Sequence, residues 1–148
     1  MVINPSTSRE QREAGMALTN ALSSSLGVKL KEKQLRLEDG ATVEIDGYSD
    51  EPPILCEAWA HYGEPKGSQP FKVMTDALKL IFTEKCLGRR FSKILLFSNE
   101  KARKPFTGKG WKAQVLRSYE IETRVLPLPE GQIKEVIKAQ KRQNGWQH

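Results

Sequence analysis

The spacing of apolar residues divides the chain into helical and extended segments. Apolar side chains at helical spacing, followed by a glycine stop, predict a first helix from Ser8 to Gly27. A capping-box spacing marks its start, either Thr7 with Glu10 or Ser8 with Gln11. Three extended segments follow, separated by the turn sequences DG and DEPP, and they cover residues 28–37, 41–49 and 53–62. Their short connections predict an antiparallel meander.

In the second half of the chain, strands alternate with helices. A helix is predicted over residues 68–88, with Met74, Ala77, Leu78 and Ile81 on its apolar face and Gly88 as its stop. The remaining segments are a buried strand at 92–98, a helix at 110–120, a strand at 121–128 and a helix at 130–142. This order predicts an α/β fold with a mixed sheet, helices on both of its faces and the meander at one edge. The length of 148 residues predicts one domain, residues 1–148.

Cysteine content and hydropathy exclude several classes of protein. Cys56 and Cys86 are too few for a disulfide framework or a four-ligand zinc site, and their apolar surroundings predict buried free thiols. No run of 18 apolar residues is present, so no membrane-spanning segment is predicted. The first residues lack the order of a secretory signal, and we therefore expect a cytoplasmic protein.

The net charge of +6 is unevenly distributed along the chain. Residues 1–60 contain ten acidic and six basic residues, whereas residues 85–112 contain nine basic residues and one acid, Glu100. Such a basic block is typical of proteins that bind the phosphate backbone of nucleic acids, although a solvated basic surface explains the charge equally well. The predicted contacts to nucleic acid are Arg89, Arg90, Lys101, Arg103, Lys104, Lys109, Trp111 and Lys112.

Acidic residues interrupt the apolar pattern of two predicted strands. Asp46 lies in the second extended segment, and Glu57 lies in an otherwise uncharged stretch of the third. If the hairpin closes through DEPP, the two carboxylates approach each other across the strands. They then need solvent, a basic partner or a cation such as Mg²⁺, which prefers oxygen ligands.

The order of elements and these two acids resemble the PD-(D/E)XK, or restriction-endonuclease-like, nuclease superfamily, over roughly residues 8–98. That family has an αβββαβ core, an acid on its second strand and a (D/E)-x-K motif on its third. The resemblance implies the same core here, with additional C-terminal α-β-α elements. It also implies an Mg²⁺ or Mn²⁺ site formed by Asp46, Glu57 and the carbonyl group of Ala58. The position of the signature lysine is occupied by Trp59.

The resemblance further implies a catalytic amine and other polar groups near the metal. Lys72 is the first candidate for the displaced amine, because it lies one helical turn beyond Gln69, and Lys66 is the second. Lys72 with Asp76 also has the spacing of an ordinary surface ion pair. Additional candidates for the site are Glu10, Glu13, Glu44, His61 and Gln69.

Three functional hypotheses follow from the sequence. The first is a divalent-metal-dependent nuclease that hydrolyses phosphodiester bonds in DNA, with Asp46, Glu57 and Lys72 as catalytic residues and a homodimer or larger assembly as an open expectation. The second is an inactive nuclease-fold module that binds nucleic acid or a protein partner, which Trp59 favours. The third is a small α/β signalling domain, for which DNA binding is absent or insensitive to salt.

Overall fold

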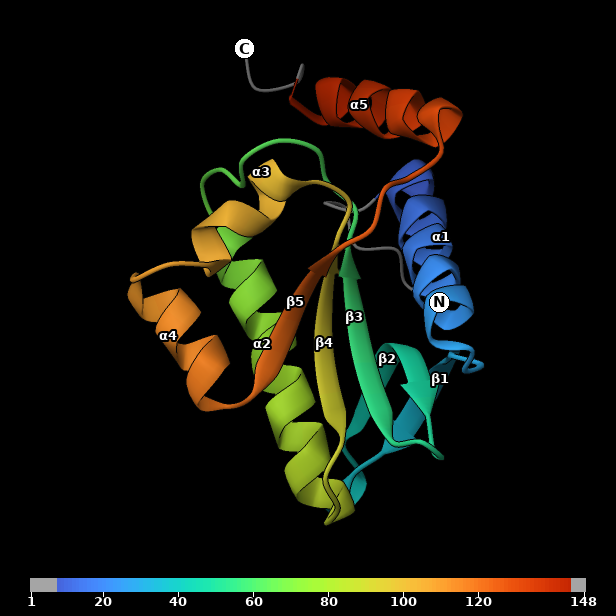
Figure 1. Cartoon of the computed structure of the whole chain (residues 1–148), viewed down its shortest axis with the longest axis vertical. Helices are drawn as coiled ribbons and strands as arrows, with labels where there is room; N and C mark the ends of the chain where they lie inside the picture. Colours follow the sequence, from blue (N-terminus) through green and yellow to red (C-terminus); the bar gives the residue numbers. More distant parts are fainter. Residues whose placement is uncertain (1–7, 145–148) are drawn as a thin grey trace.

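The computed structural model describes residues 8–144 and contains a five-stranded mixed sheet with helices on both faces (Figure 1). The strands are β1 (Lys31–Arg36), β2 (Thr42–Ser49), β3 (Ile54–Trp59), β4 (Ser92–Phe97) and β5 (Ile121–Val125). The helices are α1 (Arg9–Leu26), α2 (Gln69–Leu87), α3 (Glu100–Arg103), α4 (Trp111–Ser118) and α5 (Glu130–Asn144), with 3₁₀ turns η1 (Glu38–Gly40) and η2 (Lys104–Phe106). None of the helices in this part of the chain combines the length and the apolar character needed to cross a bilayer.

The strands are ordered β1-β2-β3-β4-β5 across the sheet. β1, β2 and β3 form the antiparallel meander, and β3, β4 and β5 are parallel. The predicted α/β class, the αβββαβ order and the position of the meander at one edge are therefore confirmed. The short helix α3 was not predicted, because its four residues contain too little apolar pattern to be recognised.

Local capping explains where the two long helices begin and end. The Ser8 hydroxyl accepts a hydrogen bond from the Gln11 backbone N–H, and the Gln11 side chain accepts one from the Ser8 N–H, so this pair forms the capping box. Thr7, in the other proposed box, lies outside the described residues. Gly27 and Gly88 end α1 and α2 in the left-handed conformation that favours glycine.

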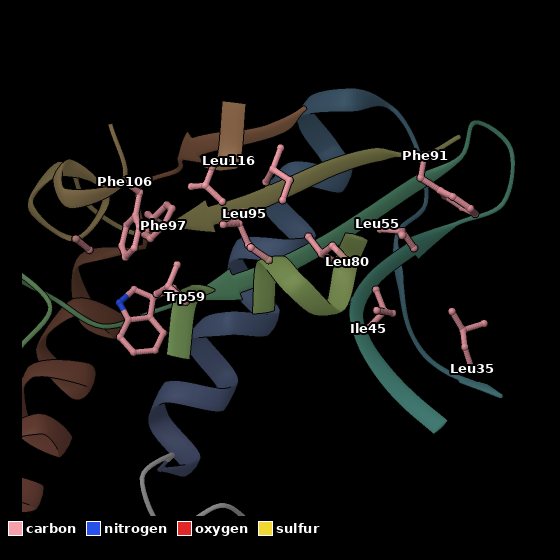
Figure 2. Packing of buried hydrophobic residues seen from close by; sticks show 14 of the residues in the cluster. Leu35, Ile45, Leu55, Trp59, Leu80, Phe91, Leu95, Phe97, Phe106 and Leu116 are labelled. Carbon is pink, nitrogen blue, oxygen red and sulfur yellow. The ribbon is translucent and has the colours of Figure 1, made fainter. Parts of the chain in front are cut away.

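Two hydrophobic clusters pack on opposite faces of the sheet. One lies beneath α2, α3 and α4 and includes Leu55, Trp59 and Phe97, which Figure 2 shows together. The other lies beneath α1 and α5 and includes Cys56 and Leu96. Alternate residues of β3 and β4 thus enter different clusters, which explains why these strands are almost continuously apolar.

The predicted apolar face of α2 is partly wrong. Leu78 is 65% exposed, and the helix is instead buried through Val73, Ala77, Leu80 and Thr83. Because α2 has apolar residues on more than one side, their spacing alone does not show which side meets the sheet. The packing of α2 against Ile45, Leu55 and Leu95 decides the matter.

Candidate functional site

The candidate site lies where β2 and β3 separate. The two strands pair over Ser49–Ile54, Tyr48–Leu55 and Gly47–Cys56, after which β2 follows β1 and β3 follows β4. On the β1 side, Lys31 pairs with Tyr48 and Lys33 with Ile45, so two steps along β1 match three along β2. The extra residue is a β-bulge at Asp46 and Gly47, a feature that bends a strand and redirects its side chains. We call Asp46, Gly47, Glu57 and Ala58 the fork.

The two acids of the fork bind the backbone groups that the separating strands leave unpaired. The Asp46 backbone N–H donates to Glu57 Oε2 at 2.9 Å, and the Ala58 backbone N–H donates to Asp46 Oδ2 at 2.9 Å. Each carboxylate therefore accepts a hydrogen bond that a backbone carbonyl of its own strand would accept if the two strands were still paired. The structure brings Asp46 and Glu57 together across the hairpin and gives both acids a structural role.

A lysine of α2 neutralises the buried member of the pair. Glu57 has a side chain only 2% exposed, and its Oε1 forms an ion pair with Lys79 Nζ. The same ammonium group donates to the Glu44 backbone carbonyl at 2.8 Å. Since a buried carboxylate is costly without a cation and hydrogen bonds, Lys79 and the Asp46 N–H together explain how Glu57 is tolerated inside the sheet.

The fork opens into a pocket of about 390 Å³. Side chains of α1, α2 and all three meander strands line it, among them Gln11, Arg12, Glu32, Glu44, His61, Lys72, Asp76 and Lys79. Lys72, Asp76 and Lys79 share one face of α2, since residues four and then three positions apart are neighbours on a helix. Five acids and three Lys or Arg residues line the pocket, so its formal charge is negative.

Burial raises the pKa of two acids in the pocket, Asp46 and Asp76. Asp46 presents part of its side chain to solvent, yet protein atoms surround the rest, and this burial raises the pKa of its carboxyl group. Hydrogen bonding from the Ala58 N–H and the charges of Lys79 and Lys72 oppose the increase. Burial and the nearby Asp46 charge raise the pKa of Asp76 to about 7, against the opposing charge of Lys72. Asp76 therefore changes protonation state near neutral pH.

His61 is neutral at physiological pH. Burial, with a further contribution from the Lys72 charge, lowers its pKa to about 4. The imidazole stacks on Trp59 with ring centroids 4.1 Å apart, and its Nδ1 lies 3.3 Å from Gln11 Nε2. Because an amide nitrogen is a donor, Nδ1 acts as the acceptor and the ring proton resides on Nε2. Trp59 is 6% exposed and fills the core beneath α2 (Figure 2).

The other predicted site residues are divided among several places. Glu44 and Ala58 line the fork pocket, whereas Gln69 and Lys66 line a second cavity. Glu10 forms an ion pair with Arg142 and Glu13 forms one with Arg9, and neither acid lines the pocket. From α1, the pocket is lined instead by Gln11, Arg12, Gly15, Met16 and Thr19.

The basic block of the sequence is not one surface in the structure. Arg89 and Arg90 precede β4 and lie at its start, whereas Lys101, Arg103 and Lys104 follow β4 at its other end (Figure 1). All three of these arginines are paired with acids: Arg89 with Asp50, Arg90 with Glu120 and Arg103 with Glu100. Near the start of α4, Lys112 Nζ lies 4.7 Å from the ring centroid of Trp111 and 4.9 Å from that of Phe71, and both rings are more than half exposed. A role of these residues in nucleic-acid binding stays a prediction.

The sequence reasoning missed Lys79 and Asp76 as members of the site, and it also missed Gln11, Arg12 and Glu32 of the same pocket. The spacing of Lys72, Asp76 and Lys79 along one helical face was a usable signal. However, it shows only that the three are neighbours. Which turn of α2 lies opposite Glu57 depends on the packing of the helix on the sheet.

A metal ion at the fork would have few protein ligands. Among residues 8–144, no group of three or more His, Cys, Asp or Glu side chains is arranged to hold a metal ion. The side-chain oxygens at the fork are those of Asp46 and Glu57, and Asp46 Oδ2 and both Glu57 oxygens already have a hydrogen-bond or ion-pair partner. Each carboxylate oxygen has a second lone pair, which is compatible with a cation that takes one or two carboxylates and several waters, as Mg²⁺ does.

Comparisons with known proteins give one distant structural similarity. No protein-family model matches the sequence, and no curated protein matches it. A crystal structure of a repair endonuclease from Pyrococcus abyssi superposes with a TM-score of 0.41 and 14% sequence identity. The superposition covers 79% of this chain and 47% of the endonuclease chain, so this chain matches about half the length of that protein.

Proposed function

We propose that this protein is a divalent-metal-dependent nuclease that hydrolyses phosphodiester bonds in DNA. The observation that supports this most directly is the fork, where Asp46 and Glu57 meet across two strands beside the ammonium group of Lys79. Paired acids that can hold a metal ion and an amine that can stabilise negative charge are groups that metal-assisted phosphodiester hydrolysis uses.

The residues at the fork fit a hard divalent cation. Asp46, Glu57 and the Ala58 carbonyl would hold it, with water completing its coordination. The electrostatics of the pocket support this assignment, because burial together with the charge of Asp46 raises the pKa of Asp76 to about 7. A bound Mg²⁺ or Mn²⁺ supplies Lewis-acid stabilisation of the phosphate and lowers the pKa of a water ligand.

Two lysines of α2 supply positive charge to the same pocket. Lys79 forms an ion pair with Glu57, a contact that the sequence did not predict. Lys72 lines the pocket as well, and its charge acts on Asp46, Asp76 and His61. In the proposed enzyme, Lys79 orients Glu57, and both ammonium groups stabilise negative charge that develops on the phosphate oxygens.

A nuclease assay with an active-site variant tests this function. Purified protein is incubated with linear, circular, branched and single-stranded DNA in the presence of Mg²⁺ or Mn²⁺. The variant Asp46→Asn keeps an oxygen that accepts the Ala58 N–H but removes the charge, and Asp39→Asn in η1 is the matched control. We expect metal-dependent products from the wild type and the control, and a rate at least about 100-fold lower for Asp46→Asn, since a metal contributes several kcal/mol to the transition state. Equal rates for the wild type and Asp46→Asn would refute the assignment.

Trp59 and the ion pair of Glu57 favour a second function, an inactive module that binds nucleic acid. A buried tryptophan, Trp59, stands at the position for which the resemblance implies a lysine, and both carboxylate oxygens of Glu57 already have partners. For this module we expect DNA binding that weakens steeply with salt, and no product with any substrate or metal. Metal-dependent products that Asp46→Asn abolishes would exclude it.

A further inference from the structure

A second cavity, of about 730 Å³, lies beside the fork pocket. Both are lined by the segment that connects β3 to α2: His61 faces the fork pocket, and Tyr62 with Gly63 lines the second cavity. The other walls come from the start of α2, from α3 and η2, and from α5. The backbone segment from His61 to Gly63 thus forms part of the wall of both cavities.

Side-chain amides hold this connection in place. Gln140 of α5 accepts a hydrogen bond from the Tyr62 N–H at 2.6 Å and donates to the Tyr62 carbonyl at 3.0 Å. Asn99 donates to the His61 carbonyl at 2.9 Å and accepts from the Gly63 N–H at 3.4 Å. These side chains bind both N–H and carbonyl groups of the connection, so its backbone is held in a defined position along the cavity wall.

The charge of the second cavity is opposite to that of the fork pocket. Lys66, Lys101 and Lys104 line it together with one acid, Glu64. These lysines form no ion pair with the residues at positions 8–144, in contrast to the neighbouring Arg103, which is paired with Glu100. Lys66 of the β3–α2 connection, Lys101 of α3 and Lys104 of η2 thus give the lining a net positive charge, which favours an anion such as phosphate.

The size and the additional donors suit a phosphate attached to a nucleotide. A cavity of this volume falls within the range that holds small organic ligands, which is more than an isolated phosphate ion needs. Gln69 accepts the Lys66 N–H through Oε1, which leaves its Nε2 as an amide donor in the lining.

We propose that this cavity binds the terminal phosphate of a nucleic-acid strand, next to the fork. The proposal rests on the proposed function, since it assigns to that nuclease, or to its inactive counterpart, a preference for phosphorylated strand ends. The acidic pocket would then hold the scissile region and the basic cavity the end of the same strand.

Binding without cleavage tests the proposal. Fluorescence anisotropy in the presence of EDTA compares labelled oligonucleotides of one sequence that carry a 5′-phosphate, a 3′-phosphate or only hydroxyl ends. We expect one terminal phosphate to tighten binding about tenfold, as hydrogen bonds to charged groups do. Lys101→Gln combined with Lys104→Gln should abolish that difference. Lys29→Gln combined with Lys31→Gln, which removes the same charge at the β1 edge, should preserve it.

Three results would overturn the proposal: equal affinity for phosphorylated and hydroxyl ends, a preference that survives the Lys101 and Lys104 substitutions, or competition by a mononucleotide as strong as that by the phosphorylated oligonucleotide. The last result would identify a free-nucleotide site. Asp46→Asn separates this proposal from the nuclease assignment, because it should keep the end preference. An end preference without cleavage would refute the nuclease alone, and cleavage without an end preference would refute this site alone.

Discussion

Replacing Asp76 with asparagine should stabilise the protein, and more strongly at high pH than at low pH. Asp76 lies in the fork pocket, where burial and the charge of Asp46 disfavour its ionised form. Asparagine has nearly the same shape and carries no charge. The substitution therefore removes the cost of ionising Asp76 and leaves Lys72 and the fork in place.

The magnitude follows from the displaced pKa. The carboxyl pKa rises from 3.8 to about 7 on folding, which corresponds to about 4 kcal/mol when the titration is complete. Between these two pKa values the unfolded chain is ionised while the folded protein keeps its proton, so the free energy of unfolding decreases as the pH rises through this interval. The decrease ends above about pH 7. Between about pH 5 and about pH 8, the gain from Asp76→Asn should grow by about 3 kcal/mol.

Urea unfolding followed by tryptophan fluorescence provides the assay, since Trp59 is buried in the folded protein. The free energies of unfolding of the wild type and Asp76→Asn are measured at both pH values, and the difference between the proteins is compared. Asp39→Asn, an exposed acid in η1, serves as the control and should give the same difference at both pH values. A gain for Asp76→Asn that is constant with pH, or that shrinks as the pH rises, would refute the assigned burial and charge repulsion.

Three further predictions concern the fork. Lys79→Met should lower the free energy of unfolding by about 3 kcal/mol, because it leaves the carboxylate of Glu57 buried without its cation, and urea titration measures this. Mg²⁺ at about 100 times its dissociation constant should stabilise the wild type by about 2.7 kcal/mol, but not Asp46→Asn. Calorimetry with and without Mg²⁺ measures this, and an equal Mg²⁺-induced change of the melting temperature in both proteins would argue against a site at Asp46. Gly47→Ala should destabilise by about 1–3 kcal/mol, since an added Cβ would lie 2.8 Å from the Thr19 side chain, whereas Gly110→Ala, with nothing within 4 Å, should lack this steric cost.

The sequence alone determined the class of fold and the position of its acids. Helical and alternating periods, with glycine stops and short turns, were enough to predict the αβββαβ order and the antiparallel meander. These signals are local, because they depend on backbone conformation and on neighbouring side chains. The same local pattern placed Asp46 and Glu57 on paired strands.

Tertiary structure alone decided what surrounds those acids. Because of the bulge at Asp46 and the divergence of β2 from β3, the two carboxylates accept hydrogen bonds from backbone N–H groups. No residue type in the sequence predicts this arrangement. The choice of Lys79 as the partner of Glu57 depends on how far α2 lies along the sheet. Likewise, a basic block that is continuous in sequence is divided between the two ends of β4, because a strand carries its flanking residues to opposite edges of the molecule. A linear pattern specifies which face of an element a side chain occupies, whereas contacts between elements depend on packing.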